Sequence, residues 1–199
     1  MDPDLETFVS LFQANDDPWG FRTRWYETRK RELTLACLPK ARYSNAYEPG
    51  CANGELLAAL ATRCERLQGS DGVSAAVELA RQRVAKLRHV EVVEALLPRE
   101  WPQDRFDLIV ISELGFYFSR EQLSDLVVCI GQSLLGAGTV LACHWRHPVE
   151  GFAFNGDDVH QTLHAGLMLP RVVHHEERDL VIDVWCADAR SVAEREGFV

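Results

Sequence analysis

The chain has 199 residues, of which 47% are apolar and 26% are charged, values that are ordinary for one globular domain. Its formal net charge of −9 argues against a nucleic-acid backbone as the main partner, and no apolar run is long enough to cross a membrane. The six cysteines are scattered, without a CxxC pair or a cysteine–histidine metal spacing. We therefore expect a single domain over residues 1–199, in the reducing cytoplasm and without a metal.

The N-terminal part begins as helices and then alternates between strand and helix. Apolar spacing predicts two helices over 2–14 and 20–37, a strand over 43–49, a helix from Leu56 to Cys64, a strand over 65–71 and a helix from Ser74 to Leu87. The break between the first two helices is rich in turn residues.

The C-terminal part repeats this alternation and ends in a predicted hairpin. The near-continuous apolar run 106–112 is typical of a strand that is buried on both faces. The other predicted elements are a strand over 90–93, a helix opened by a Ser119–Gln122 capping box and stopped by Gly136 and Gly138, a strand over 139–145, a short helix near 157–166, and strands over 171–176 and 179–187. We expect an α/β three-layer sandwich, Rossmann-like, with a mostly parallel seven-stranded sheet and a C-terminal antiparallel hairpin.

A glycine-containing turn follows the first predicted strand. Glu48 closes this strand, Gly50 and Gly54 bracket Cys51 and Ala52, and an apolar helix begins at once. Backbone N–H groups in such a turn can face an anionic group, such as the carboxylate of an amino-acid-like cofactor. The alternative is a plain strand–helix turn.

Asp71, followed by Gly72, stands at the end of the second predicted strand, about 20 residues beyond the glycine turn. A carboxylate at this place can accept hydrogen bonds from both hydroxyls of a ribose, although it could instead cap the next helix. Together with the glycine turn, it favours a nucleoside cofactor. After the third strand, a backbone N–H near Ala95 or Leu96 could contact adenine, unless this segment is a simple exit loop.

The ends of the fourth and fifth strands carry the candidates for chemistry. Ser112, Glu113 and Tyr117 follow the fourth strand, where a carboxylate with aromatic rings suits a cationic sulfonium and an amine acceptor. The alternative places the aromatic rings in the core and Glu113 on the surface. His144 ends the fifth strand and is a candidate base, or else a structural histidine. The pair His160 and His164 lacks a third ligand, so we do not expect a metal there.

With these residues in view, the sequence resembles the class I S-adenosylmethionine (SAM)-dependent methyltransferases, and most of all the NodS-like family, named for nodulation protein S. Three matching segments, 48–54, 69–81 and 106–113, are general to the superfamily. Two are narrower: 16–27 is similar to the family's "DPW…WYE" segment, and 144–148 to its "HWRHP" stretch. That family N-methylates the deacetylated, non-reducing glucosamine of a chitooligosaccharide.

The resemblance implies transfer of a methyl group from SAM, with S-adenosylhomocysteine (SAH) as product, to a small-molecule acceptor, most readily the amine of an amino sugar. Residues 1–37 would form a helical cap over the cofactor. The expected cofactor-binding residues are Trp19, Glu48, Gly50, Cys51, Ala52, Gly54, Asp71, Gly72, Ala95, Leu96 and Ser112; the expected catalytic residues are Glu113 and His144; the expected substrate-binding residues are Tyr117, Trp145 and Arg146. The alternatives are a SAM-binding protein of the same fold without turnover and an NAD-dependent oxidoreductase.

Overall fold

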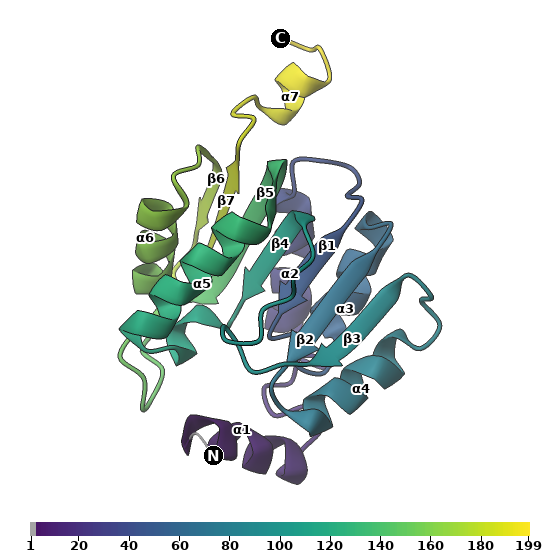
Figure 1. Ribbon diagram of the computed structural model, residues 1–199, viewed down its shortest axis with the longest axis vertical. Helices are drawn as coiled ribbons and strands as arrows, with labels where there is room; N and C mark the ends of the chain where they lie inside the picture. Colours follow the sequence, from purple (N-terminus) through teal and green to yellow (C-terminus); the bar gives the residue numbers. More distant parts are fainter. Residues whose placement is uncertain (1–2) are drawn as a thin grey trace.

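The protein is built on one seven-stranded sheet, seen in a computed structural model that describes residues 3–199 (Figure 1). The strands are β1 (Ala46–Pro49), β2 (Leu67–Asp71), β3 (Val90–Glu94), β4 (Phe106–Ser112), β5 (Leu134–Trp145), β6 (Arg171–Glu176) and β7 (Leu180–Cys186). Their order is β3-β2-β1-β4-β5-β7-β6. Strands β1 to β5 pair in parallel, whereas β7 runs antiparallel to β5 and β6.

Helices cover both faces of this sheet. They are α1 (Pro3–Ala14), α2 (Trp25–Cys37), α3 (Glu55–Leu60), α4 (Ser74–Val84), α5 (Arg120–Ser133), α6 (Gly156–Leu167) and α7 (Val192–Arg195), with short 3-10 helices η1 (Ala61–Arg63) and η2 (Gly115–Tyr117). One core contains apolar side chains of α3 and α4 and packs against α2; the other contains those of α5 and α6. The predicted three-layer α/β sandwich is therefore the observed fold.

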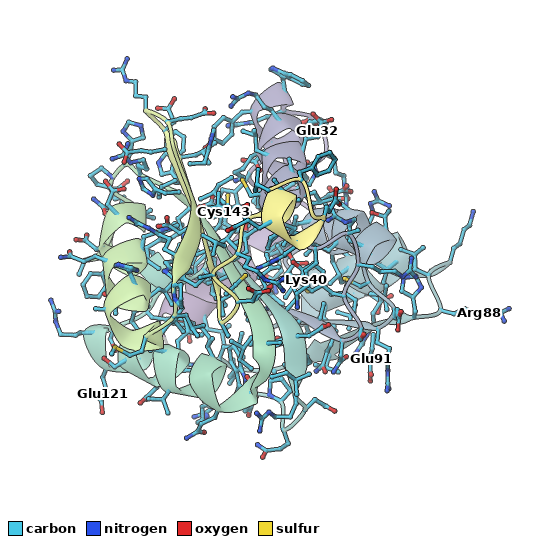
Figure 2. The ribbon with its side chains drawn as sticks, turned by 90° about the horizontal axis from the view of Figure 1, so that it is seen from above. Glu32, Lys40, Arg88, Glu91, Glu121 and Cys143 are labelled. Carbon is cyan, nitrogen blue, oxygen red and sulfur yellow. The ribbon has the colours of Figure 1, made fainter. Side chains whose placement is uncertain are left out.

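Strand β4 shows why the sheet has two cores. Leu108 and Val110 belong to the core beneath α3 and α4, whereas Ile109 and Ile111 belong to the core beneath α5 and α6, and all four are fully buried. Successive side chains of a strand point to opposite faces, so an uninterrupted apolar run fits a strand covered on both sides. Seen from above, the labelled Cys143 of the adjacent β5 lies in the interior, while Arg88 and Glu121 point outward (Figure 2).

The carboxyl ends of the parallel strands meet at one edge of the sheet, and α1 lies beyond this edge (Figure 1). Strand β1 pairs with β2 on one side and β4 on the other, so the connections diverge there to the two halves of the sheet. Open α/β sheets bind ligands at such a divergence, outside the carboxyl ends of the strands. No helix within residues 3–199 combines the length and the apolar character that a bilayer span requires.

Several predicted boundaries differ from the observed ones, including the starts of β1 and β5 and the end of α4, and two of the differences have a clear physical reason. Helix α2 begins at Trp25 rather than at residue 20, because the carboxylate of Asp17 accepts the backbone N–H groups of Phe21 and Arg22 and holds a turn there. Helix α5 ends at Ser133, before Gly136 and Gly138, which lie inside β5. Pairing of Leu134 with Phe106 of β4 starts the strand there, so the two glycines do not stop the helix.

Candidate active site

A cavity of about 1450 Å³ opens at the carboxyl edge of the sheet. Its wall includes residues at or just beyond the ends of β1 to β5 and residues of the segment that contains α1 and α2. A single drug-sized ligand typically fills about 300–1000 Å³, so this cavity has room for a nucleoside cofactor and a second molecule. All the predicted site residues except Gly54, His144 and Arg146 line it.

The turn after β1 holds three left-handed residues, which wrap it closely around the end of the strand. Their φ angles are 71° at Gly50, 47° at Ala52 and 81° at Gly54. Gly54 lies outside the cavity and packs on α4, where a Cβ atom would stand 2.9 Å from the Cα of Ala80. Gly54 was predicted to bind the cofactor, but its position gives it an indirect contribution: it sets the path of the turn, because only glycine allows α3 and α4 to approach this closely.

Two carboxylates face this turn. Asp71 accepts the backbone N–H of Ala52 with one oxygen and that of Val73 with the other, each at 3.0 Å. Burial raises the pKa of Asp71, although these hydrogen bonds act in the opposite direction. Glu48 is 2% exposed and its Oε2 has no hydrogen-bond partner among the described residues; burial, and then the nearby Asp71, raise its pKa well above the usual value. Each Asp71 oxygen still has a lone pair for a ligand.

The segment after β3 forms the wall next to Asp71. The backbone N–H of Ala95 donates to the Asp71 carbonyl, at 2.9 Å, and is therefore not free for a ligand. The N–H of Leu96 donates to Oε2 of the exposed Glu100, at 2.7 Å. The sequence predicts that the N–H of Ala95 or Leu96 contacts adenine. Only the Leu96 N–H can leave its present acceptor without breaking a backbone hydrogen bond between the ends of β2 and β3.

Asp17 fastens the loop before α2 to the glycine turn. It accepts the side-chain N–H of Asn53 at 3.0 Å, in addition to the two backbone donors that hold its own turn. Beside it, the Trp19 ring packs against Phe12 and Phe21, with centroids 5.7 and 5.5 Å away. Trp19 thus lines the cavity from the N-terminal segment, as the sequence predicts.

Glu113 follows β4 directly and lines the cavity on the side farther from β2 in the strand order β2-β1-β4-β5. Its φ of 51° is left-handed, which costs a non-glycine residue about 1–2 kcal/mol. One carboxylate oxygen accepts the backbone N–H of Trp145 at 2.9 Å, and the other lies 2.6 Å from Nζ of Lys30. A strained residue held by its neighbours in a cavity is a candidate for function. Tyr117 and Trp145, both partly buried, line the same side of the cavity.

Sequence reasoning missed Lys30 and its second partner Glu27, both buried in α2. The available signal was their spacing, because residues three apart on a helix face each other. Nothing in the sequence connects them to Glu113, which is 83 positions further along.

His144 lies beneath the cavity instead of in it, which argues against the predicted base. It is fully buried, and its Nε2 accepts the backbone N–H of Gly115 at 3.3 Å. Because that N–H can only donate, the ring proton is on Nδ1, which donates to Nε2 of His160 at 3.1 Å; His160 in turn donates to Asp183 at 2.7 Å. Burial, and then the neighbouring His160, lower the pKa of His144 well below its usual value. Both ring nitrogens are occupied, so we assign His144 to the support of the loop at Gly115.

Arg146 is also absent from the wall of the cavity. Its guanidinium group binds Asp157 at 2.8 Å and Glu176 at 2.9 Å, beside a smaller hollow on the α6 side of the sheet. The predicted substrate contact is therefore not supported by its position. Within residues 3–199, no group of three or more metal-binding side chains is arranged to hold an ion.

Replacement of His144 by Gln should change how stability depends on pH. The folded protein keeps His144 neutral, whereas the unfolded chain protonates it below a pKa of about 6.5. The unfolded state then binds the extra proton, so His144 makes the free energy of unfolding fall by about 1.4 kcal/mol per pH unit below 6.5. In His144→Gln this dependence of the unfolding free energy on pH should disappear. At pH 7.5 the unfolding free energy of the variant should be lower by about 1–2 kcal/mol, because the hydrogen bonds of His144 are broken.

Urea unfolding at pH 7.5 and 5.5 measures this effect. The difference in unfolding free energy between the wild type and His144→Gln should shrink at the lower pH. Ser133→Ala provides the control, because it removes the hydrogen bond that the buried Ser133 accepts from Trp101 and no titratable group, so its difference from the wild type should be the same at both pH values. Parallel curves for wild type and His144→Gln would show that His144 is not kept neutral by the fold.

Comparison with known proteins supplies independent information. The family model of nodulation protein S (NodS) matches residues 8–147. Nodulation protein S of Rhizobium tropici is 30% identical over 122 residues, which are 61% of this chain and 50% of that protein. The chain thus spans about half the length of this curated relative.

Two solved structures share the arrangement of strands and helices. A "putative Methyltransferase" from Pseudomonas syringae is 48% identical, with a TM-score of 0.74 over 82% of this chain and 99% of the other. The N-methyltransferase NodS from Bradyrhizobium japonicum WM9, solved in complex with SAH, is 23% identical, with a TM-score of 0.84 over 93% of this chain and 98% of the other. These matches confirm the predicted Rossmann-like fold.

Proposed function

The chain belongs to the nodulation protein S (NodS) family, and we propose that it is an enzyme that transfers the methyl group of SAM to the nitrogen of a small amine. The observation that carries this proposal is the composition of the cavity. Asp71 and the glycine turn follow β2 and β1, whereas Glu113 and Trp145 lie where β4 and β5 end, so the strand order β2-β1-β4-β5 places the two groups toward opposite ends of the cavity. A ligand bound along the cavity would therefore have its nucleoside held at one end and its reacting group presented to a second molecule at the other.

The residues at the first end fit SAM. Asp71 has free lone pairs for the two ribose hydroxyls, and Glu48 offers a buried oxygen without a hydrogen-bond partner on the same side. The wall of the cavity also contains Cys51, Ala52, Gly72, Leu96 and Ser112. When bound, SAM supplies a methyl group activated by a positively charged sulfur. The N-terminal segment with Trp19 is proposed to cover this end and exclude water.

At the second end, the protein needs to orient an amine rather than form a covalent bond with it. An amine attacks only through its neutral nitrogen, with the lone pair toward the methyl group. Glu113 is proposed to accept an N–H of the amine and so to direct that lone pair. Tyr117 and Trp145 are proposed to line the acceptor side, because aromatic faces attract a cationic group.

We propose an amino sugar as the acceptor, on the family relationship, and a small-molecule oxygen nucleophile as the next candidate. The volume of the cavity supports an acceptor of that size. The six cysteines are free thiols, which supports a reducing compartment such as the cytoplasm. The terminal antiparallel hairpin and the Gly50–Ala52–Asn53 turn, which lacks the third glycine, favour SAM over NAD.

Calorimetry with SAH, thermal shift with SAM and with NAD, and an assay of SAH formation test this function. Glucosamine and a deacetylated chitooligosaccharide are the first acceptors to offer. We expect heat on titration with SAH, stabilisation by SAM but not by NAD, and SAH formation that depends on the amine. Binding of SAH without methylation of any amine or sugar would favour a binding protein without turnover, and no heat with SAH would refute the proposal.

Glu113→Gln should lower kcat about tenfold while leaving the affinity for SAH unchanged. The amide keeps the size of the side chain but loses the charge, so one charge-assisted hydrogen bond to the acceptor weakens by about 1.4 kcal/mol. Steady-state kinetics with glucosamine and calorimetry with SAH measure the two effects. Glu91→Gln, at an exposed position of β3, is the control and should change neither. An equal loss in SAH affinity would place Glu113 at the cofactor instead.

A further inference from the structure

A buried lysine joins the N-terminal segment to the acceptor end of the cavity. Lys30 of α2 is 5% exposed, and its Nζ lies 3.0 Å from a carboxylate oxygen of Glu27 and 2.6 Å from one of Glu113. The same Nζ stands over the rings of Tyr26 and Phe21, 5.4 and 5.9 Å from their centroids. Isolated buried ammonium groups are very costly, so a lysine in this position needs both of its carboxylate partners.

Lys30 and its two partners carry the charge of this end of the cavity. Burial alone would lower the pKa of Lys30, but the attraction of Glu113, among other groups, outweighs burial, and the pKa is raised. The other titratable groups facing it stay neutral near pH 7. Burial raises the pKa of Tyr26, of Tyr117 in η2 and of Cys143 in β5, the last to about 12, and burial lowers the pKa of His144. With both carboxylates ionised, the cluster has a net charge of −1.

The contacts of Glu113 leave its carboxylate little freedom. Lys30 binds one oxygen from the N-terminal segment, the Trp145 N–H binds the other from the end of β5, and the left-handed backbone fixes where the side chain begins. Both oxygens act as acceptors in these contacts, because an ammonium group and a backbone N–H can only donate hydrogen bonds. The side chain remains 18% exposed, on the cavity side.

We propose that Lys30 is a positioning residue for the methyl transfer: its ammonium group fixes one oxygen of Glu113, so that the carboxylate stays oriented toward the acceptor. Glu27 acts through Lys30, by holding the ammonium group between the two carboxylates. This inference rests on the proposed function, and it adds a residue of the cavity wall that acts through Glu113. It also explains why the N-terminal segment carries a buried charge where an apolar side chain would cost less.

Three variants separate this proposal from a purely structural contribution of Lys30. Lys30→Met removes the ammonium group and leaves two facing carboxylates, so the cluster charge becomes −2. Lys30→Met with Glu27→Gln removes the ion pair within α2, which returns the cluster to −1 and leaves no unpaired buried carboxylate on α2 if the single variant folds poorly. Lys30→Arg preserves the charge, and Lys86→Met, on the exposed lysine after α4, is the matched control.

Steady-state kinetics with glucosamine is the first measurement. In both Met variants kcat should fall about tenfold while the KM for SAM stays unchanged, because the Glu113 carboxylate loses its contact with Nζ and can turn away from the acceptor. Lys30→Arg and Lys86→Met should keep a kcat close to that of the wild type, and calorimetry should give the wild-type affinity for SAH in every variant.

Carbon-detected NMR of the Glu113 carboxyl group in the SAH complex, assigned through Glu113→Gln, gives a readout that does not need turnover. The proposal predicts that this carboxyl resonance moves in both Met variants, because the carboxylate loses its contact with Nζ of Lys30, and that it stays in place in Lys86→Met. An unchanged resonance in both Met variants, or a kcat that falls in Lys30→Met and returns to the wild-type value in the double variant, would overturn the proposal. If the wild type methylates no amine, the proposed function fails, whereas the carboxyl resonance still decides whether Lys30 holds Glu113.

Discussion

Replacement of Asp71 by Asn should lower the affinity for SAH by about 100- to 1000-fold. The proposed ribose contact uses two hydrogen bonds to a charged carboxylate, each worth about 1.5–3 kcal/mol. Asn keeps one acceptor oxygen and loses the charge, so about 3–4 kcal/mol is lost, at about 1.4 kcal/mol for each factor of ten. Calorimetric titration with SAH measures the affinity, and the unfolding transition without ligand shows whether the fold survives.

Asp107 offers a matched control for this substitution. It also accepts two backbone N–H groups, those of Ser44 and Asn45, both at 2.9 Å, but it stands near the start of β4, away from the cavity. Asp107→Asn should cost about 1–2 kcal/mol of stability and leave the affinity for SAH intact. Similar losses of affinity in both variants would mean that Asp71 acts only through the fold, and the proposed cofactor site would lose its central residue.

Gly54→Ala should destabilise the protein by about 2–3 kcal/mol. The left-handed backbone at this residue costs any other side chain about 1–2 kcal/mol, and the new Cβ would stand 2.9 Å from the Cα of Ala80. Because a backbone atom cannot rotate away, α3 and α4 would have to separate, which moves the turn that faces the cofactor. Urea unfolding measures the loss, and SAH affinity should fall with it.

Gly131→Ala is the control for this second substitution. Gly131 lies in α5, and a Cβ atom there would meet nothing within 4 Å. Alanine is the better helix former, so this variant should gain about 0.5–1 kcal/mol. A Gly54→Ala variant as stable as the wild type would show that the turn tolerates a side chain and that the close approach of α3 and α4 is not required.

The sheet could be predicted because its signals are local. A strand such as 106–112 can be recognised from its uninterrupted apolar residues. The residues just after parallel strands all lie at the carboxyl edge of the sheet, and this does not depend on how the side chains pack. Asp71 and Glu113 were found in this way, from their places at the ends of β2 and β4. The same rule could not tell which way a side chain turns at a strand end.

His144 illustrates this limit. Its place at the end of β5 was predicted, but its burial depends on His160 and Asp183, which come from α6 and β7. Lys30 illustrates another limit, because its partner Glu113 is 83 positions away. The start of α2 depends on the backbone N–H groups whose hydrogen bonds Asp17 accepts, because these bonds hold residues 21 and 22 in a turn instead of a helix. Apolar spacing does not distinguish between these two conformations.

The hydrogen bond between Glu100 and the N–H of Leu96 bears on which nucleosides the protein would distinguish. A purine ring that accepts the Leu96 N–H would replace the Glu100 carboxylate as the acceptor, so binding of the purine gains little net free energy from this hydrogen bond. The protein would then distinguish ligands mainly by their sugar and their amino-acid portion, and it would have low specificity for the base. Analogues with an altered heterocycle would be tolerated where analogues without the diol would be rejected.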